Sequence, residues 1–211
     1  HYNNGDEIPT GYTNEEWTAI DSGAYAFYND SDTYTGIFGN LYNWYAVDDE
    51  RGVCPEDWHV PTDDEIKELE MYLGMSQEDA DVSFAFRGTN EGGMLKEGGT
   101  VHWDSEMCGE PECPDGSTGC NCSGFSALAG GYRDLYGAYQ SMGYWGYFWS
   151  STQNNNFPWF RKLEHNNSEI LRSQMVDKQV GLSVRCIRDE PAETGTIHIP
   201  QDYPTIQAGI D

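Results

Sequence analysis

The six cysteines of this 211-residue chain constrain its fold more than any other feature. Cys54 and Cys186 stand far apart, whereas the other four fall within fifteen residues: Cys108, Cys113, Cys120 and Cys122. This spacing predicts one long-range disulfide, Cys54–Cys186, and two local ones. Cys120 and Cys122 are too close along an extended chain to pair with each other. Cys108 therefore bonds to Cys120 and Cys113 to Cys122, or Cys108 bonds to Cys122 and Cys113 to Cys120.

This cysteine content favours an oxidising, extracellular location. A four-cysteine zinc site is the competing interpretation of the local cluster. However, its C-x4-C-x6-C-x-C spacing differs from the paired C-x2-C pattern of structural zinc. The sequence has no run of about 18 apolar residues, so we expect no membrane insertion.

The formal net charge is −25, and it is distributed unevenly. Residues 1–122 carry 27 acidic and 4 basic residues, whereas residues 123–188 carry 4 acidic and 7 basic residues. A chain this acidic repels nucleic acid, so we expect no nucleic-acid partner. The asymmetry favours head-to-tail docking between copies of the chain. A uniformly solvated acidic surface is the alternative.

A helix over residues 61–74 is the clearest local prediction. Thr62 and Glu65 form a capping box, and Gly74 is a typical stop residue. Apolar residues follow at helical spacing, at Ile66, Leu69 and Leu73, and the outer face is expected to hold Lys67, Glu68 and Glu70. Shorter helices are expected at 14–24, capped by Asn14, and at about 77–86.

The second half of the chain has a strand-like pattern. Aromatic residues make up 14% of the sequence and there are 24 glycines, a composition typical of a turn-rich, mostly β domain. The strand-like runs are 125–133, 144–151, 157–165, 168–176 and 181–188. Residues 104–123 interrupt the pattern as an inserted loop that its own disulfides would hold. With the helices, these runs predict an α+β fold.

Five sequence blocks identify a relative: GNLYNWYAV (39–47), GVCPEDWHVPTDDE (52–65), GFSALAGGYRD (124–134), GYFWSST (146–152) and GLSVRCIRD (181–189). Their order resembles the Fibrobacter succinogenes major paralogous domain, a module of secreted bacterial proteins. The resemblance implies a C-type-lectin-like fold, which is a twisted antiparallel sheet with two short helices and long, disulfide-stapled loops. A Cys54–Cys186 bridge fits that fold.

The resemblance also sets the expected domain boundaries. The domain covers 1–189, and the family's usual first strand is missing before His1, so an upstream piece is expected. Residues 190–195 form a linker, and 196–211 resemble the opening of a truncated, pectin-lyase-type parallel β-helix. Within this tail, a β run could add to an open sheet edge and serve assembly: Thr196, Ile197, His198 and Ile199.

Aromatic side chains are the first candidates for ligand binding, because flat rings can stack on sugars. The candidates are Tyr144, Trp145, Tyr147 and Trp159. Core packing with a subunit contact is the alternative reading of this group. Trp44, Trp58 and Trp149 lie inside the family blocks and are expected in the core.

Calcium is a candidate ligand because carboxylates in loop-like sequence suit it. The candidate residues are Asp30, Asp32, Asp48 and Asp49. However, Leu41 occupies the position where an EF-hand would carry its last acidic ligand. Sequence motifs of serine hydrolases, zinc proteases and phosphate-binding loops are absent, so no catalytic residue is assigned. His59 is expected to be buried and hydrogen-bonded in a structural role.

We therefore expect a secreted, non-enzymatic cell-surface module that self-associates, as the subunit of an extracellular filament or sheath. The alternative is a carbohydrate-binding or adhesion module attached to a larger secreted protein that acts on polysaccharide. Any lyase activity would belong to the missing β-helix region. The expected partners are further copies of the chain or a polysaccharide.

Overall fold

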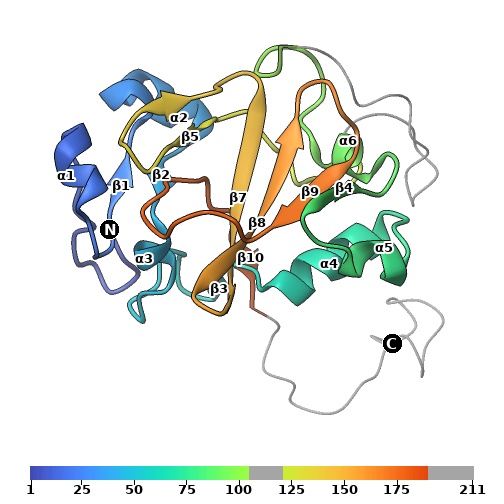
Figure 1. Cartoon of the computed structure of the whole chain (residues 1–211), viewed down its shortest axis with the longest axis horizontal. Helices are drawn as coiled ribbons and strands as arrows, with labels where there is room; N and C mark the ends of the chain where they lie inside the picture. Colours follow the sequence, from blue (N-terminus) through green and yellow to red (C-terminus); the bar gives the residue numbers. More distant parts are fainter. Residues whose placement is uncertain (105–120, 190–211) are drawn as a thin grey trace, which may run out of the picture.

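A four-stranded antiparallel sheet forms the centre of the protein, for which a computed structural model describes residues 1–104 and 121–189. The strand order is β4 (Ala85–Arg87), β9 (Ile170–Ser173), β8 (Phe157–Glu164) and β7 (Trp145–Asn154). Figure 1 shows this sheet between α4, α5 and α6 on one side and α1, α2 and α3 on the other. The mixed α and antiparallel β class predicted from the sequence is confirmed.

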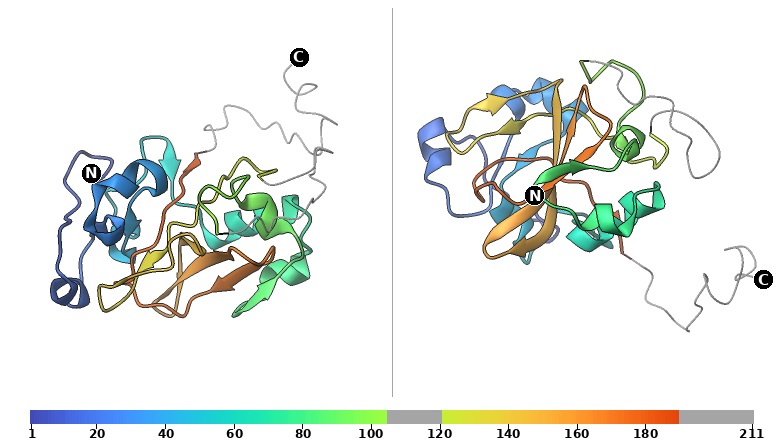
Figure 2. Two further views of the ribbon diagram at one scale, coloured as in Figure 1. Left: turned by 90° about the horizontal axis from the view of Figure 1, so that it is seen from above. Right: turned by 45° about the vertical axis from the view of Figure 1, so that its right-hand side comes forward.

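Short elements surround this sheet. Three strand pairs accompany it: β1 (Tyr25–Ala26) with β2 (Leu41–Tyr42), β3 (Trp58–His59) with β10 (Ile187–Arg188), and β5 (Tyr132–Arg133) with β6 (Tyr139–Gln140). The helices are α1 (Asn14–Thr18), η1 (Tyr28–Asp30), η2 (Asp32–Tyr34), α2 (Thr35–Phe38), α3 (Trp44–Val47), α4 (Asp63–Tyr72), α5 (Gln77–Asp81) and α6 (Glu91–Leu95). Figure 2 shows the early, blue segments and the green helices at opposite ends. No helix in the described ranges is long and apolar enough to cross a membrane.

The β7–β8 hairpin is the longest strand pair, and its turn sets the register of the nearest pairs, up to an irregularity between Trp149 and Gln153. Asn154 pairs with Phe157, so the loop consists of Asn155 and Asn156. Both residues have positive φ, 50° and 70°, the conformation that a two-residue type I′ turn requires. Asparagine tolerates this conformation better than most residues. The strands expected at 144–151 and 157–165 are therefore present, close to their predicted bounds.

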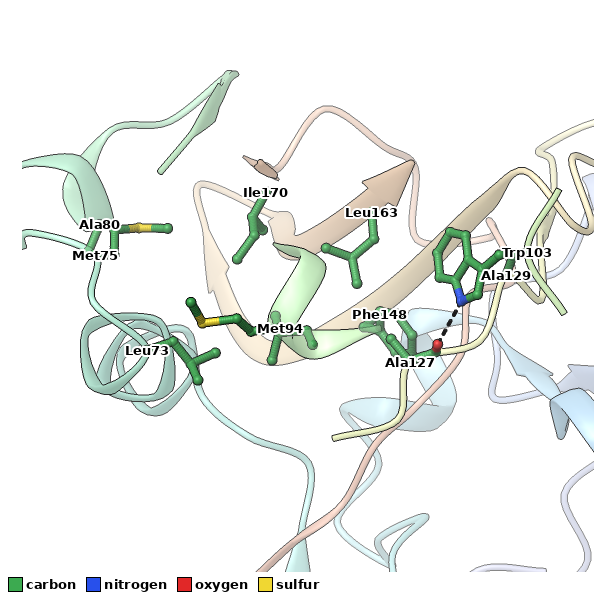
Figure 3. Close-up of a cluster of buried hydrophobic side chains, with 11 residues drawn as sticks. Leu73, Met75, Ala80, Met94, Trp103, Ala127, Ala129, Phe148, Leu163 and Ile170 are labelled. Carbon is green, nitrogen blue, oxygen red and sulfur yellow. Dashed lines mark hydrogen bonds between the residues drawn. The ribbon is translucent and has the colours of Figure 1, made fainter. Parts of the chain in front are cut away.

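Both faces of the central sheet are covered by apolar side chains. Phe148 and Leu163 belong to a cluster on the side of α4 to α6, which Figure 3 shows with Met94, Ile170 and Trp103. Their neighbours in sequence point the other way, because successive residues of a strand alternate between faces. Trp149 and Phe160 accordingly pack with residues of α3 and of the disulfide region.

Helix α4 begins and ends as its sequence predicts. The Thr62 side chain accepts a hydrogen bond from Glu65 N, and Thr62 N donates one to Glu65 Oε2, forming the capping box. Gly74 N donates to Met71 O and Met75 N donates to Glu70 O, the two bonds of a Schellman motif. The prediction for the outer face was wrong for one residue, since Glu70 is fully buried.

Glu70 is buried because α4 lies on a sheet face that carries three arginines. Arg161 Nε lies 2.7 Å from Glu70 Oε1 and Arg87 Nη2 lies 2.8 Å from Glu70 Oε2. At the other end of the helix, Asp63 receives Arg161 Nη1 at 2.7 Å and Arg172 Nη2 at 2.5 Å. Burial acts to raise the pKa of Asp63, but Arg172 and Arg161 together hold it below its ordinary value. These five residues are called the ionic core below.

Two other predicted helices are shorter than expected. Helix α1 ends at Thr18 rather than near residue 24, and its cap is Thr13, which forms a capping box with Glu16. Helix α5 ends at Asp81, and strand β4 follows at Ala85. The pairing of β4 with β9 supplies backbone hydrogen bonds that an extended helix would have lost.

Two of the three tryptophans in the family blocks lie in the core, as predicted. Trp44 and Trp149 are buried, at 0% and 1% exposure. Trp58 is 43% exposed, so its assignment to the core was wrong. His59 is hydrogen-bonded, but its side chain is 39% exposed rather than buried. Nδ1 of His59 lies 2.5 Å from Asp189 Oδ1, which links β3 to the end of the described domain.

Candidate functional site

A pocket of about 390 Å³ opens beside α2 and β2. Its outer wall comes from residues 35–42, and its floor comes from residues 183–185 together with single side chains of two other segments. The lining residues are Thr35, Ile37, Phe38, Gly39, Asn40, Tyr42, Leu128, Phe148, Ser183, Val184 and Arg185. We call this the α2 pocket. Its volume lies in the range of about 300–1,000 Å³ that is usual for small-molecule sites.

The floor of the pocket is fixed by backbone hydrogen bonds. Tyr42 and Leu182 exchange two backbone bonds, which join β2 to the segment after β9. Ser183 N donates to Tyr147 O, and Trp149 N donates to Ser183 O, so the same segment is also joined to β7. Residues 183–185 are thus held between two sheets. The floor is therefore rigid in comparison with a free loop.

The disulfide predicted from the sequence anchors this floor from its far end. Cys54 and Cys186 are bonded, and Cys186 directly follows Arg185. Cys122 is also disulfide-bonded. The remaining cysteines of the local cluster, Cys108, Cys113 and Cys120, lie outside the described residues, so the choice between the two local pairings stays open.

The pocket wall has unused hydrogen-bonding capacity. Thr35 Oγ1 and Asn40 Oδ1 are buried and have no hydrogen-bond partner among the described residues. The Asn40 amide nitrogen donates to the Tyr42 hydroxyl at 3.3 Å, and burial raises the pKa of that phenol. Buried polar atoms in folded proteins are nearly always paired. Both atoms are closed off from water, so they lie behind the pocket surface rather than facing its open space.

Arg185 gives the floor its only charged side chain. Its Nη2 donates to Ser126 O at 2.8 Å, and the guanidinium has no carboxylate partner in the described part of the chain. Burial lowers the pKa of Arg185 from its ordinary value, and no carboxylate offsets that effect. Among the described residues, the pocket lining contains no Asp or Glu, although the chain carries 36 of them. The α2 pocket thus differs sharply in charge from the surface of the protein.

The aromatic residues predicted to bind ligand lie elsewhere, along β7 and β8. Tyr144 is 47% exposed and packs edge-on against His165. Trp145 and Tyr147 are half-buried, and Lys162 Nζ lies 3.5 Å from the centre of the Trp145 ring. One face of Trp145 is therefore covered from within the protein.

Trp159 is buried, at 8% exposure, and its position does not suit sugar stacking. The Arg172 guanidinium lies 3.9 Å from the centre of its ring. Trp159 therefore packs inside the sheet face that carries the ionic core. Little of its ring is open to a ligand, and ligand binding by Trp159 stays a prediction.

The four calcium candidates fall into two separate loops. Asp30 accepts a hydrogen bond from the Tyr139 hydroxyl at 2.5 Å, and Asp32 begins η2. Asp49 is held by Arg51, which lowers its pKa to about 2, whereas burial raises the pKa of Asp48. Within the described ranges, no three His, Cys, Asp or Glu side chains are grouped so that they could hold a metal ion. Calcium binding stays a prediction.

The assembly tail, Thr196, Ile197, His198 and Ile199, lies outside the described residues. The linker at 190–195 lies there as well. The linker and the role of the tail in assembly therefore stay predictions.

The α2 pocket was missed in the sequence because its parts are far apart along the chain. Residues 35–42, Leu128, Phe148 and residues 183–185 meet only through the pairing of β2, β7 and the 181–183 segment. One signal was present. Arg185 is a lone basic residue next to a cysteine that was expected to be bridged.

Comparison with known families agrees with the five sequence blocks. The model of the Fibrobacter succinogenes major domain matches residues 1–188. No curated protein and no solved structure matches the chain. The family match contains the first four blocks quoted above and all but the last residue of the fifth, and it includes both strands that the Cys54–Cys186 region joins. The chain therefore belongs to the Fibrobacter succinogenes major domain family.

Proposed function

We propose that this protein is a secreted, non-enzymatic module that binds carbohydrate in the α2 pocket. The observation that carries the proposal is one small pocket in which the apolar side chains of Ile37 and Phe38 lie beside the polar side chains of Asn40, Ser183 and Arg185. A sugar residue offers the matching surfaces, since its C–H faces pack on apolar side chains and its hydroxyls donate and accept hydrogen bonds. The disulfide is in keeping with a location outside the cell.

The wall provides both kinds of contact. The Phe38 ring and Ile37 supply apolar surface at the mouth, where Ile37 is 47% exposed. Asn40 adds an amide group to the outer wall, next to the Tyr42 hydroxyl, and Ser183 adds a polar side chain on the floor. Pockets that bind small ligands usually combine an apolar lining with a few polar groups placed to fix orientation.

A glycan array with the full chain tests this proposal. We expect binding to a limited set of oligosaccharides, with loss of binding in Phe38→Ala and Asn40→Ala. Trp145→Ala is the matched control on the aromatic row along β7, and thermal unfolding would check that each variant folds. Loss of binding in Trp145→Ala alone would move the site to that row. Absence of any glycan ligand would refute the proposal.

Self-association is a second candidate function, and a separate surface favours it. Phe84, Phe157 and Met175 line a shallow hollow of about 450 Å³ and are 51%, 48% and 76% exposed. Phe84 directly precedes β4, an edge strand that pairs only with β9 among the described residues. An open edge beside exposed apolar side chains suits strand pairing with a second copy of the chain.

Sedimentation and negative-stain electron microscopy test this second function. We expect polymers of the full chain that disappear in Met175→Asp and after deletion of residues 190–211, which would add the tail to the interface. Monomers of the unchanged protein at high concentration would contradict it.

We also propose that the domain is a variant of the C-type-lectin-like fold, for which the Cys54–Cys186 link between an early segment and the last strand is the main support.

A further inference from the structure

We infer that the α2 pocket selects an acidic sugar residue, whose anionic group pairs with the Arg185 guanidinium. This inference rests on the proposed carbohydrate binding and adds the class of ligand. A carboxylate of a uronic acid and a sulfate ester share the required chemistry, which is a compact anion with several acceptor oxygens.

The buried arginines show how unusual the half-buried Arg185 is among the described residues. Arg87, Arg161 and Arg172 each pair with a buried carboxylate in the ionic core. Arg133 has no carboxylate, but its guanidinium donates to two backbone carbonyls and lies 4.3 Å from the Trp17 ring centre. Arg185 has a single carbonyl partner, and its guanidinium lies 5.8 Å from the Phe125 ring centre.

The pocket provides what an anion needs and lacks what would repel it. No carboxylate from residues 1–104 or 121–189 lines it, and Ser183 and Asn40 lie among the same lining residues as Arg185. A guanidinium that is partly removed from water gains more from an anion than one that is fully solvated. Burial with no compensating carboxylate also lowers the Arg185 pKa, and a bound anion would reverse that effect.

Short-range pairing has to overcome the charge of the whole protein. The net charge of −25 repels anions at long range, but salt screens that repulsion over about 8 Å at physiological ionic strength. A contact inside a pocket is screened far less. An acidic ligand is therefore compatible with an acidic protein as long as the pocket supplies the cation.

Isothermal titration calorimetry with matched oligosaccharides tests the inference on the full chain. The probes are oligomers of glucuronate, galacturonate and mannuronate, their carboxyl-reduced neutral counterparts, and a sulfated galactan oligomer. We expect at least one acidic probe to bind about 10- to 100-fold more tightly than its neutral counterpart, as for one hydrogen-bonded charge. Arg185→Gln should abolish this preference, so that acidic and neutral probes bind with similar affinity.

Arg188→Gln is the matched control, because this substitution removes the same charge from an exposed residue three positions after Arg185. It should keep the preference. Arg185→Lys should retain part of it, which separates loss of charge from loss of fold. A stronger response to the sulfated probe would identify the anion as a sulfate ester. Equal binding of acidic and neutral probes would overturn this inference and leave carbohydrate binding intact, whereas no binding of any probe would refute both.

Discussion

The ionic core makes Glu70 the most informative position for a test of stability. Glu70 is fully buried, and it receives hydrogen bonds from Arg87 and Arg161. Glu70→Gln keeps the shape of the side chain but removes its charge. Asp63 would then be the one carboxylate left in the ionic core, facing three guanidiniums. The new amide group would also point N–H donors at an arginine.

The magnitude follows from the two lost charge-assisted bonds. Hydrogen bonds to charged groups contribute about 1.5–3 kcal/mol each. Removing one member of a buried ion pair costs about 3–5 kcal/mol, because the remaining charge is left unpaired. We therefore expect Glu70→Gln to lower the free energy of unfolding by about 3–5 kcal/mol. For a domain of this size, that corresponds to a fall in Tm of roughly 6–20 °C.

Urea unfolding followed by tryptophan fluorescence measures this difference. Glu68→Gln is the control, because Glu68 is exposed on the same helix and should change stability by less than about 0.5 kcal/mol. The urea dependence of the unfolding free energy should be the same in all three proteins. If Glu70→Gln were as stable as Glu68→Gln, the ionic core would not contribute to stability as described.

Three further changes probe the anchors of the fold. Replacing Cys54 and Cys186 together by Ala should cost about 5 kcal/mol in urea unfolding, because the bridge closes a separation of 132 residues, and a loss below 1 kcal/mol would contradict this. Asp189 and Glu65 raise the pKa of His59, so the stability that this histidine contributes is full below about pH 6.5 and is lost as pH rises through the folded-state pKa. The difference in unfolding free energy between the unchanged protein and His59→Asn should be larger at pH 6 than at pH 8.5. A constant difference would refute the pairing. Gly131→Ala would place a Cβ 2.2 Å from Gln140 O and should cost about 1–3 kcal/mol more than Gly143→Ala, which has positive φ but open space, so equal losses in thermal unfolding would contradict the close packing.

Elements specified by neighbouring residues could be predicted from the sequence. The capping box of Thr62 and Glu65 fixed the start of α4, and Gly74 fixed its end. The paired asparagines at 155 and 156 form the turn between two long strands that were expected. These features depend on contacts within a few residues, which the order of the sequence already contains.

Features that depend on distant residues could not be predicted. Glu70 was expected to face solvent because no local pattern announces that three arginines from β4, β8 and β9 lie opposite. The ionic core also pairs acidic residues of the first part of the chain with basic residues of the second part. Part of the charge asymmetry is therefore neutralised inside one molecule. Trp159 lies on the same sheet face, where the Arg172 guanidinium packs on its ring.

The α2 pocket is the central functional claim, and the most direct test is to map the bound ligand. Backbone amide shifts in NMR spectra of the full chain would be followed during titration with the tightest oligosaccharide from the array. We predict that the largest changes occur at Asn40, Ser183 and Arg185. Changes confined to residues 144–147 would contradict the account and place the ligand on the aromatic row of β7.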